Sequence, residues 1–186
     1  MTLLTHGRFV AGALALSCLS WFTAKVEIPE ADGKVRYVLV QPAPSVQATE
    51  TRKNAIASYL ASRYRQNKAR VRHYVDLAFA EAQKHPDVEP ELILAVIQKE
   101  SSMGLQLRSA YGAEGLMQVV KRFHRDKLEQ GESLMRPDVN IRVGSRILQD
   151  YIEEHGQLRT ALARYSGNAR GYADFVLRET NQLKAI

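Results

Sequence analysis

The chain has 186 residues, 45% of them hydrophobic and 25% charged, enough to bury the core of one ordinary domain. This composition excludes fibrous, collagenous and wholly disordered proteins. Cys18 is the only cysteine, which excludes an intramolecular disulfide and a cysteine-based metal site, and we expect no metal and no cofactor. The formal net charge of +6 allows nucleic acid, an anionic membrane or another acidic polymer as partner, without choosing among them.

The first 24 residues have the layout of a secretory signal. Arg8 places a positive charge before Phe9–Phe22, a stretch without charge that is rich in Ala and Leu, and Ala24 is a candidate cleavage position. The apolar run is shorter than the roughly 20 residues that a membrane span needs. We therefore expect residues 1–24 to be a signal peptide that exports the protein to the periplasm or cell envelope. The alternative is membrane association through residues 9–22 as an uncleaved anchor, or a lipoprotein.

Residues 25–49 are typical of a linker, because they contain three prolines and no run that could form a core. One alternating stretch, Lys34–Val40, favours a short strand. From about residue 50 onward the apolar residues recur at helical spacing. We therefore expect an all-α globular domain over residues 50–186, preceded by the signal or anchor and by a short linker.

The helical pattern predicts seven helices in this domain, with a loop over Leu105–Glu114 between the third and the fourth. Pro90 suits the first turn of the third helix, where a missing N–H costs nothing, and Gly156 marks the end of the fifth. The expected ranges are about 50–67, 70–84, 90–102, 116–124, 139–154, 158–165 and 171–183.

The segment 51–75 holds basic side chains and no acidic one. It could be a solvated helix face, or it could contact an anionic surface such as lipid headgroups or the carboxylates of a cell wall. No zinc finger or RNA-recognition motif accompanies it, so we expect no nucleic-acid partner. The basic residues are Arg52, Lys53, Arg63, Arg65, Lys68, Arg70 and Arg72.

Glu100 occupies a position at which helical periodicity calls for an apolar residue. The buried stripe of the helix that begins at Pro90 contains Ile93, Val96 and Ile97, and position 100 continues it. A buried carboxyl is costly unless it is paired or neutralised, and burial raises its pKa. A raised pKa suits a general acid that works near neutral pH. Periodicity alone also allows a glutamate in the last turn that leans into solvent or pairs with an arginine.

A glycine-rich segment follows Glu100. Gly112 and Gly115 permit tight turns and a close approach of the backbone to a ligand, and the short side chains around them would leave an open groove. Gln118 offers a donor and an acceptor that suit sugar hydroxyl or acetamido groups. The segment lacks the lysine of a phosphate-binding loop, and no strand precedes it. By itself it indicates only a glycine-rich loop that enters a helix.

Several motifs between about residues 88 and 176 occur in an order that a known family shares. They are the helix Pro90–Ile97, Glu100-Ser101, Ser109, Gly112-Ala113, Gly115–Gln118, Asn140–Gly144, Ala161–Tyr165 and Tyr172–Val176. In this order they resemble the soluble lytic transglycosylase (SLT) family. That family has a fold like goose-type lysozyme, and the resemblance implies the same all-α, lysozyme-like fold here.

The resemblance implies a peptidoglycan lytic transglycosylase with Glu100 as its single catalytic acid/base. Such an enzyme cleaves the β-1,4 bond between N-acetylmuramic acid and N-acetylglucosamine in glycan strands, and the muramoyl C6 hydroxyl closes a 1,6-anhydro ring. Because the sugar supplies the nucleophile, the second carboxylate that most glycosidases use is not needed. The resemblance further implies substrate-binding roles for Ser109, Met117, Gln118 and Tyr165, for which turn or packing roles are the alternatives. We expect a monomer.

Three positions depart from the family pattern. Ser166 stands where many relatives have asparagine, and Val120 and Ile147 stand where well-known members carry methionine and tyrosine. These positions are expected in or near the groove, so the subsite preferences stay open. His124 could serve as a metal ligand or a base, but no second ligand stands at suitable spacing, and we expect a role at a helix end.

Two other functions remain open from the sequence. A muramidase would add water and would need Glu114 or Asp126 as a second carboxylate, and its products would carry a reducing end. A wall-binding module at an envelope or secretion complex would need no acid in its groove. The sequence does not distinguish cleavage within strands from cleavage at their ends.

Overall fold

The computed structural model describes residues 24–29, 35–40, 45–105 and 107–186. The predicted signal or anchor lies outside these residues except for Ala24. The described residues before position 45 form two antiparallel strands, β1 (Ala24–Pro29) and β2 (Val35–Val40), with Ala24 opposite Val40. The predicted strand over Lys34–Val40 is thereby confirmed. No helix in the described part of the chain is long and apolar enough to span a bilayer.

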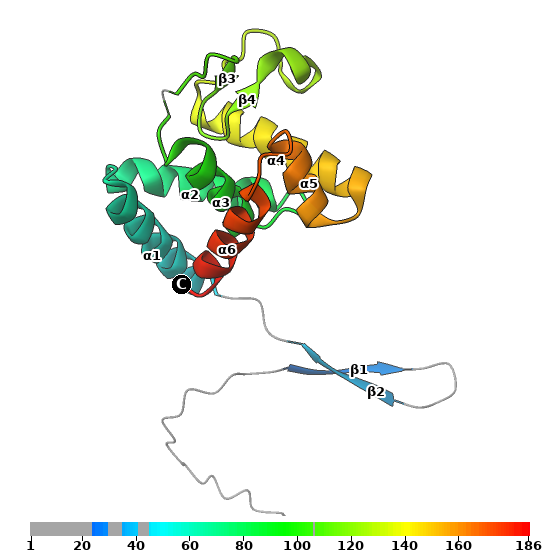
Figure 1. The fold of residues 1–186 in the computed structure, drawn as a ribbon. Helices are drawn as coiled ribbons and strands as arrows, with labels where there is room; N and C mark the ends of the chain where they lie inside the picture. The colour runs from blue at the N-terminus through cyan, green and yellow to red at the C-terminus, as the bar shows by residue number, and fades with distance from the viewer. Residues whose placement is uncertain (1–23, 30–34, 41–44, 106) are drawn as a thin grey trace, which may run out of the picture. The chain divides into compact units, whose positions relative to one another are not determined.

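Residues 45–186 form a separate helical unit (Figure 1), and the prediction of an all-α domain is confirmed. Six of the seven predicted helices are present, and their bounds lie close to the predicted ranges. They are α1 (Val46–Tyr64), α2 (Lys68–Ala82), α3 (Pro90–Ser101), α4 (Pro137–His155), α5 (Leu158–Tyr165) and α6 (Tyr172–Lys184).

Local signals begin and end these helices. The side chains of Ser45 and Asn67 cap α1 and α2 by accepting hydrogen bonds from the backbone N–H groups of Ala48 at 3.1 Å and Arg70 at 3.0 Å. α3 and α4 both begin with a proline, whose fixed φ suits the first turn. Gly156 ends α4 in the left-handed conformation that a glycine adopts without strain.

α3 runs through the centre of the hydrophobic core. Every residue from Glu91 to Gln98 is buried, and α2 and α6 pack against the helix. The buried Glu91 carboxylate is 2.8 Å from the Arg52 guanidinium of α1, so the charge is paired. The last turn of α3, which carries Glu100, is therefore attached to the most firmly packed part of the unit.

Four of the seven basic residues in the segment 51–75 bind acidic side chains of the protein itself. Arg63, for example, lies 2.9 Å from the buried carboxylate of Glu179 and thereby joins α1 to α6. Within the described residues, no ion pair engages Arg65, Lys68 or Arg70. The pairs are Arg52 with Glu91, Lys53 with Glu50 and Asp76, Arg63 with Glu179, and Arg72 with Glu50 and Asp76.

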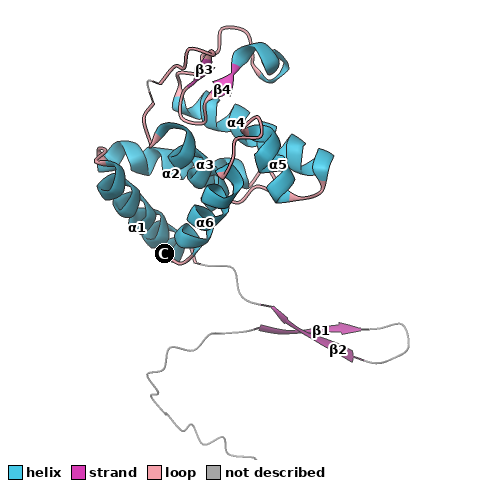
Figure 2. Ribbon diagram, viewed as in Figure 1, coloured by secondary structure: helices cyan, strands magenta, loops and turns pink. Residues whose placement is uncertain are grey.

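The predicted helix over residues 116–124 is wrong. In its place a short hairpin and 3-10 turns lie beside α4 (Figure 2). Gly115 and Gln118 have φ values of 75° and 47°, which lie outside the right-handed helical region and break any helix there. The elements are β3 (Ala113–Glu114), antiparallel to β4 (Val119–Val120), then η1 (Lys121–Phe123) and η2 (Arg125–Lys127).

Asn140, in the first turn of α4, holds this hairpin in place. Its side chain is fully buried, and its Oδ1 accepts a hydrogen bond from the Met117 N–H at 2.7 Å. Its Nδ2 donates to the carbonyl oxygens of Glu114 at 2.8 Å and Leu134 at 2.9 Å. The backbone of Gly115 passes so close that a Cβ there would lie 2.3 Å from Nδ2. One amide therefore satisfies three backbone groups of an irregular segment.

We predict that Asn140→Ala lowers the free energy of unfolding by roughly 3 kcal/mol, because three backbone groups lose their partner in a site from which water is largely excluded. Urea denaturation measures this change. Asn181→Ala, at an exposed position of α6, is the matched control and should change stability by less than about 0.5 kcal/mol. Equal effects of the two substitutions would contradict the structural role of Asn140.

Candidate active site

A cavity of about 730 Å³ lies where the end of α3, the β3–β4 hairpin, α4 and α5 meet. Glu100 is the only carboxylate among the described residues that line it. The other lining residues are Ser109, Tyr111, Ala113, Gln118, Val119, Val120, Phe123, His124, Ile147, Tyr151, Arg164, Tyr165, Ser166 and Gly167.

Glu100 is half-buried in the wall of this cavity. The hydroxyl of Tyr172, the first residue of α6, donates a hydrogen bond to Glu100 Oε1 at 2.6 Å. Burial raises the pKa of Glu100 and is the largest effect, while the Tyr172 hydrogen bond and the Lys99 charge lower it. The net shift is upward, so this carboxyl keeps its proton to a higher pH than an exposed glutamate, as a general acid requires.

Two tyrosines extend this environment. Tyr165, at the end of α5, lines the cavity, and its hydroxyl donates to the Met117 carbonyl at 2.9 Å. Burial raises the pKa of Tyr165 and of Tyr172, and the negative charge of Glu100 raises both further. Both hydroxyls therefore stay protonated and act as donors.

Tyr172 was not among the predicted site residues. The sequence held one indication of such a role, because Tyr172 begins the last of the motifs that resemble the family. It is the first residue of α6, at the end of that helix that faces α3. Its contact with Glu100 depends on the packing of α6 against α3, which no sequence spacing specifies.

Ser109 and Gln118, for which substrate-binding roles were predicted, both line the cavity. Ser109 Oγ accepts a hydrogen bond from the Ala113 N–H at 3.0 Å, and Gln118 Nε2 donates to the carbonyl oxygens of Leu107 at 3.1 Å and Gly115 at 2.9 Å. These contacts fix both side chains. The Ser109 hydroxyl proton and Gln118 Oε1 have no hydrogen-bond partner within the described residues and are available to a ligand.

The Met117 side chain does not line the cavity, although the residue was predicted to bind substrate. It is fully buried and packs against Gly144 of α4. A Cβ added to Gly144 would lie only 2.4 Å from the Met117 sulfur, so glycine is needed there. Met117 contributes to the site through its carbonyl oxygen, which accepts the hydrogen bond from Tyr165.

The two carboxylates considered for hydrolysis lie outside the cavity wall. Glu114 pairs with Arg108 at 3.1 Å, and Asp126 is largely exposed and pairs with Lys127 at 3.0 Å. The Lys127 ammonium lowers the pKa of Asp126, which keeps that carboxylate ionised. The described cavity therefore presents one carboxyl to a ligand.

The three positions that depart from the family pattern, Val120, Ile147 and Ser166, all line the cavity. His124 lines it as well, at the end of η1, and burial lowers the pKa of its imidazole, which is therefore neutral at pH 7. No group of three or more His, Cys, Asp or Glu side chains in the described part of the chain could hold a metal ion.

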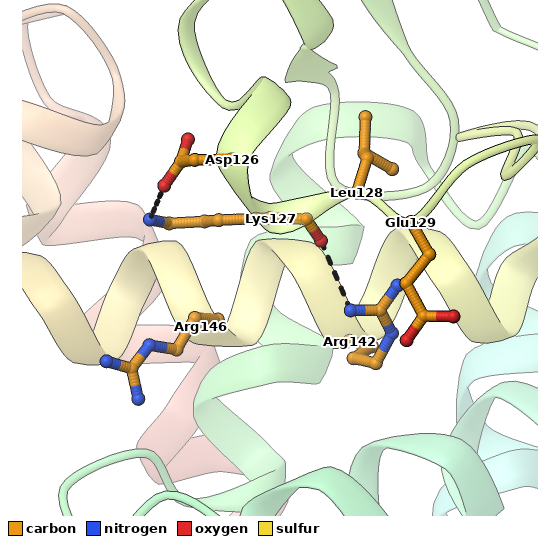
Figure 3. A pocket seen from close by; sticks show the side chains of 6 residues that line it. All are labelled: Asp126, Lys127, Leu128, Glu129, Arg142 and Arg146. Atoms are coloured by element: carbon orange, nitrogen blue, oxygen red, sulfur yellow. Dashed lines mark hydrogen bonds and ion pairs between the residues drawn. The ribbon is translucent and has the colours of Figure 1, made fainter.

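A second cavity, of about 420 Å³, lies beside α4 and is lined by residues 126–129 with Arg142 and Arg146 (Figure 3). Its three basic side chains already have acidic partners. Lys127 and Arg146 both pair with Asp150 at 2.8 Å, and Arg142 donates to the Lys127 carbonyl at 3.2 Å. Glu100 is not part of this cavity, and an anionic ligand would have to replace existing ion pairs.

Comparison with known families identifies the domain. Residues 77–181 match the family model described as the transglycosylase SLT domain, which is more than half of the chain. The chain belongs to the transglycosylase SLT domain family. The part of this SLT domain that matches contains α3, the hairpin, α4 and α5, and it covers Glu100 and Tyr172. The predicted family is thereby confirmed, and α1 lies outside the match.

Lysozyme g from Gallus gallus is similar to this chain, with 31% identity over 102 residues. The match covers 46% of this chain and 46% of the lysozyme. The chain therefore corresponds to about half the length of that relative. With the six helices described above, this similarity supports the predicted lysozyme-like fold class.

We predict that Tyr172→Phe raises the pKa of Glu100, because the ionised carboxylate loses the hydrogen bond that stabilises it. Titration of the ¹³C-labelled side-chain carboxyls by NMR measures the shift. Tyr64→Phe deletes a hydroxyl that donates to Gln98 Oε1 at 3.1 Å and is the matched control. A pKa of Glu100 that is the same in the parent and in Tyr172→Phe would contradict the role of this hydrogen bond.

We also predict that Glu100→Gln is more stable than the parent at pH 7. Because the folded-state pKa of Glu100 is raised, the unfolded chain releases this proton first as the pH rises, and the parent loses stability. The difference should shrink as the pH falls below about 4, where the carboxyl is protonated in both states. Thermal unfolding of both proteins from pH 3 to 8 tests this. If the stability difference between Glu100→Gln and the parent grew toward low pH, a raised pKa of Glu100 would be contradicted.

Proposed function

We propose that the protein is a peptidoglycan lytic transglycosylase with Glu100 as its single acid/base. The observation that carries the proposal is a half-buried carboxyl with a raised pKa, which is the only carboxylate lining the described cavity. Membership of the SLT domain family supports the substrate class, glycan strands of peptidoglycan. The bond cleaved would be the β-1,4 linkage between N-acetylmuramic acid and N-acetylglucosamine.

In the first half of the proposed reaction, the Glu100 carboxyl donates its proton to the glycosidic oxygen. The bond from that oxygen to the muramoyl anomeric carbon breaks, and N-acetylglucosamine leaves with a free 4-hydroxyl group. Burial raises the pKa of Glu100 and so favours the protonated form that this step needs. The Tyr172 hydroxyl at 2.6 Å stabilises the carboxylate that the step leaves behind.

In the second half, the Glu100 carboxylate accepts the proton of the muramoyl C6 hydroxyl. The C6 oxygen bonds to the anomeric carbon and closes the 1,6-anhydro ring, and Glu100 is protonated again. No water is consumed and no second carboxylate is required, which agrees with a cavity wall that contains only one. Ser109, Gln118 and Tyr165 would position the sugars.

Hydrolysis is the second candidate, and the similarity to a lysozyme favours it. It would need a carboxylate or an activated water opposite Glu100, and Glu114 and Asp126 are paired outside the cavity wall. A wall-binding module without catalysis is the third reading. It does not account for an acid with a raised pKa in the groove.

We further propose that the protein acts as a monomer outside the cytoplasmic membrane, where its substrate lies. Arg8 followed by the apolar residues 9–22 supports export. Those residues lie outside the described part of the chain. Fractionation of cells that express the tagged protein would test this, since recovery from the cytoplasm alone would refute export.

We predict that the purified protein releases 1,6-anhydromuropeptides from isolated sacculi, as read by mass spectrometry. Glu100→Gln removes the proton donor but keeps a hydrogen-bond acceptor for Tyr172, so release should fall by at least roughly 100-fold. Release from Glu100→Gln at the parent rate would refute the assignment of the acid.

Glu114→Gln is the matched control, because it makes the same change to a carboxylate outside the cavity wall. A transglycosylase should retain most of its activity in this variant. Products with a reducing end, lost in Glu114→Gln, would identify a muramidase instead.

A further inference from the structure

Two large aromatic side chains at the edge of the Glu100 cavity are exposed to solvent. Tyr111, in the loop before β3, is 61% exposed, and Phe123, at the end of η1, is 58% exposed. Both also line the cavity. Their ring centroids are 6.3 Å apart and the rings are tilted by 41°, so the pair forms a continuous apolar surface.

Arg122 braces this pair. The centre of its guanidinium lies 4.0 Å from the Tyr111 ring centroid and 4.7 Å from that of Phe123. Its Nη1 also donates to the Tyr111 carbonyl oxygen at 2.8 Å. We call Tyr111, Arg122 and Phe123 the aromatic platform.

The platform joins two segments that the pairing of β3 with β4 brings together. The Tyr111 loop is closed by hydrogen bonds between Ser109 and the backbone N–H groups of Gly112 and Ala113. Phe123 follows β4 directly through η1. An apolar surface that is exposed but already ordered loses little conformational entropy when a ligand covers it.

We propose that the aromatic platform binds a pyranose ring of the glycan strand by stacking, as a subsite next to the cleaved bond. This inference rests on the proposed function, because the same cavity holds Glu100 and the two rings. A β-linked pyranose has an apolar face of C–H groups and a rim of hydroxyl and acetamido groups. The platform matches the face, and Ser109 and Gln118 on the same cavity wall match the rim.

The guanidinium of Arg122 acts as a positioning group in this subsite. Its contacts with both rings and with the Tyr111 carbonyl hold the rings at a fixed tilt. Arg122→Gln should therefore weaken sugar binding through loss of ring order. Arg122→Gln should also reduce the ring-current shifts that the platform causes in a bound sugar. These shifts would not change if Arg122 only stabilised the fold.

The test uses Glu100→Gln as the background and chitohexaose, a β-1,4-linked oligomer of N-acetylglucosamine, as the probe. Isothermal titration calorimetry gives the affinity, and NMR gives the shifts of the sugar protons. Tyr111→Ala and Phe123→Ala should each weaken binding roughly two- to tenfold. Sugar C–H resonances should move upfield on binding and lose this shift in the double variant. Tyr111→Phe keeps the ring and should bind like the background.

Leu107→Ala is the control for exposed apolar surface, since Leu107 is 43% exposed and does not line the cavity. It should leave chitohexaose affinity unchanged. Background-level affinity in the Tyr111→Ala, Phe123→Ala double variant, or a bound sugar without upfield shifts, would overturn the proposal. The proposal would also be overturned if the background protein bound vesicles of anionic phospholipid through the two rings while its affinity for chitohexaose did not depend on them.

Failure of the proposed reaction leaves a different result. If sacculi yield no anhydromuropeptides while chitohexaose binding still depends on Tyr111 and Phe123, the platform is a sugar subsite of a protein with another activity. If anhydromuropeptides form and the two rings do not affect chitohexaose binding, the proposed reaction is supported and the proposed sugar subsite is refuted.

Discussion

The buried amide of Asn140 is the interaction on which the cavity wall depends. The segment between α3 and α4 has a hairpin of two two-residue strands and two 3-10 turns, too little regular structure to order itself. The Asn140 side chain accepts one hydrogen bond from this segment and donates two to it, which attaches the segment to the first turn of α4, and the close approach of Gly115 leaves no room for a side chain there. Gln118 and the aromatic platform can line the cavity only because this attachment fixes the segment between α3 and α4 on a rigid helix.

The environment of Glu100 is a balance between burial and hydrogen bonding. Burial alone would favour the neutral acid strongly, and the Tyr172 hydroxyl moderates this by stabilising the carboxylate. The reaction proposed for Glu100, in which it gives a proton and then takes one back, needs both forms to be accessible. The α3–α6 contact therefore affects the pKa of Glu100 as well as packing the core, and a change in that contact should alter both stability and protonation.

Most charged side chains on α1 and α2 form ion pairs within the helical unit. Most of the basic residues on α1 and α2 pair with acids on α1, α2, α3 and α6, which offsets part of the cost of burying the carboxylates of Glu91 and Glu179. The groove contains one carboxyl, the guanidinium of Arg164, uncharged polar groups and exposed aromatic rings. Polar groups placed beside aromatic rings suit the hydroxyl groups and the apolar ring faces of a sugar chain, which agrees with the function proposed for the groove.

The sequence by itself determined six of the helices and the family, and it gave Glu100 as the candidate acid. The six helices followed from apolar periodicity and from prolines and glycines at their ends, because these are local properties of the chain. Glu100 became the candidate because a carboxyl interrupted an apolar stripe within an ordered set of motifs. Tertiary structure alone decided that residues 116–124 form no helix, because the Met117 N–H binds the side chain of Asn140, far along the chain, and Gln118 has a positive φ. It also decided that Met117 faces the core, that Tyr172 reaches Glu100 and that Tyr111 meets Phe123. Each of these contacts joins segments that are remote in sequence or turned by a positive φ, and helical spacing carries no information about either.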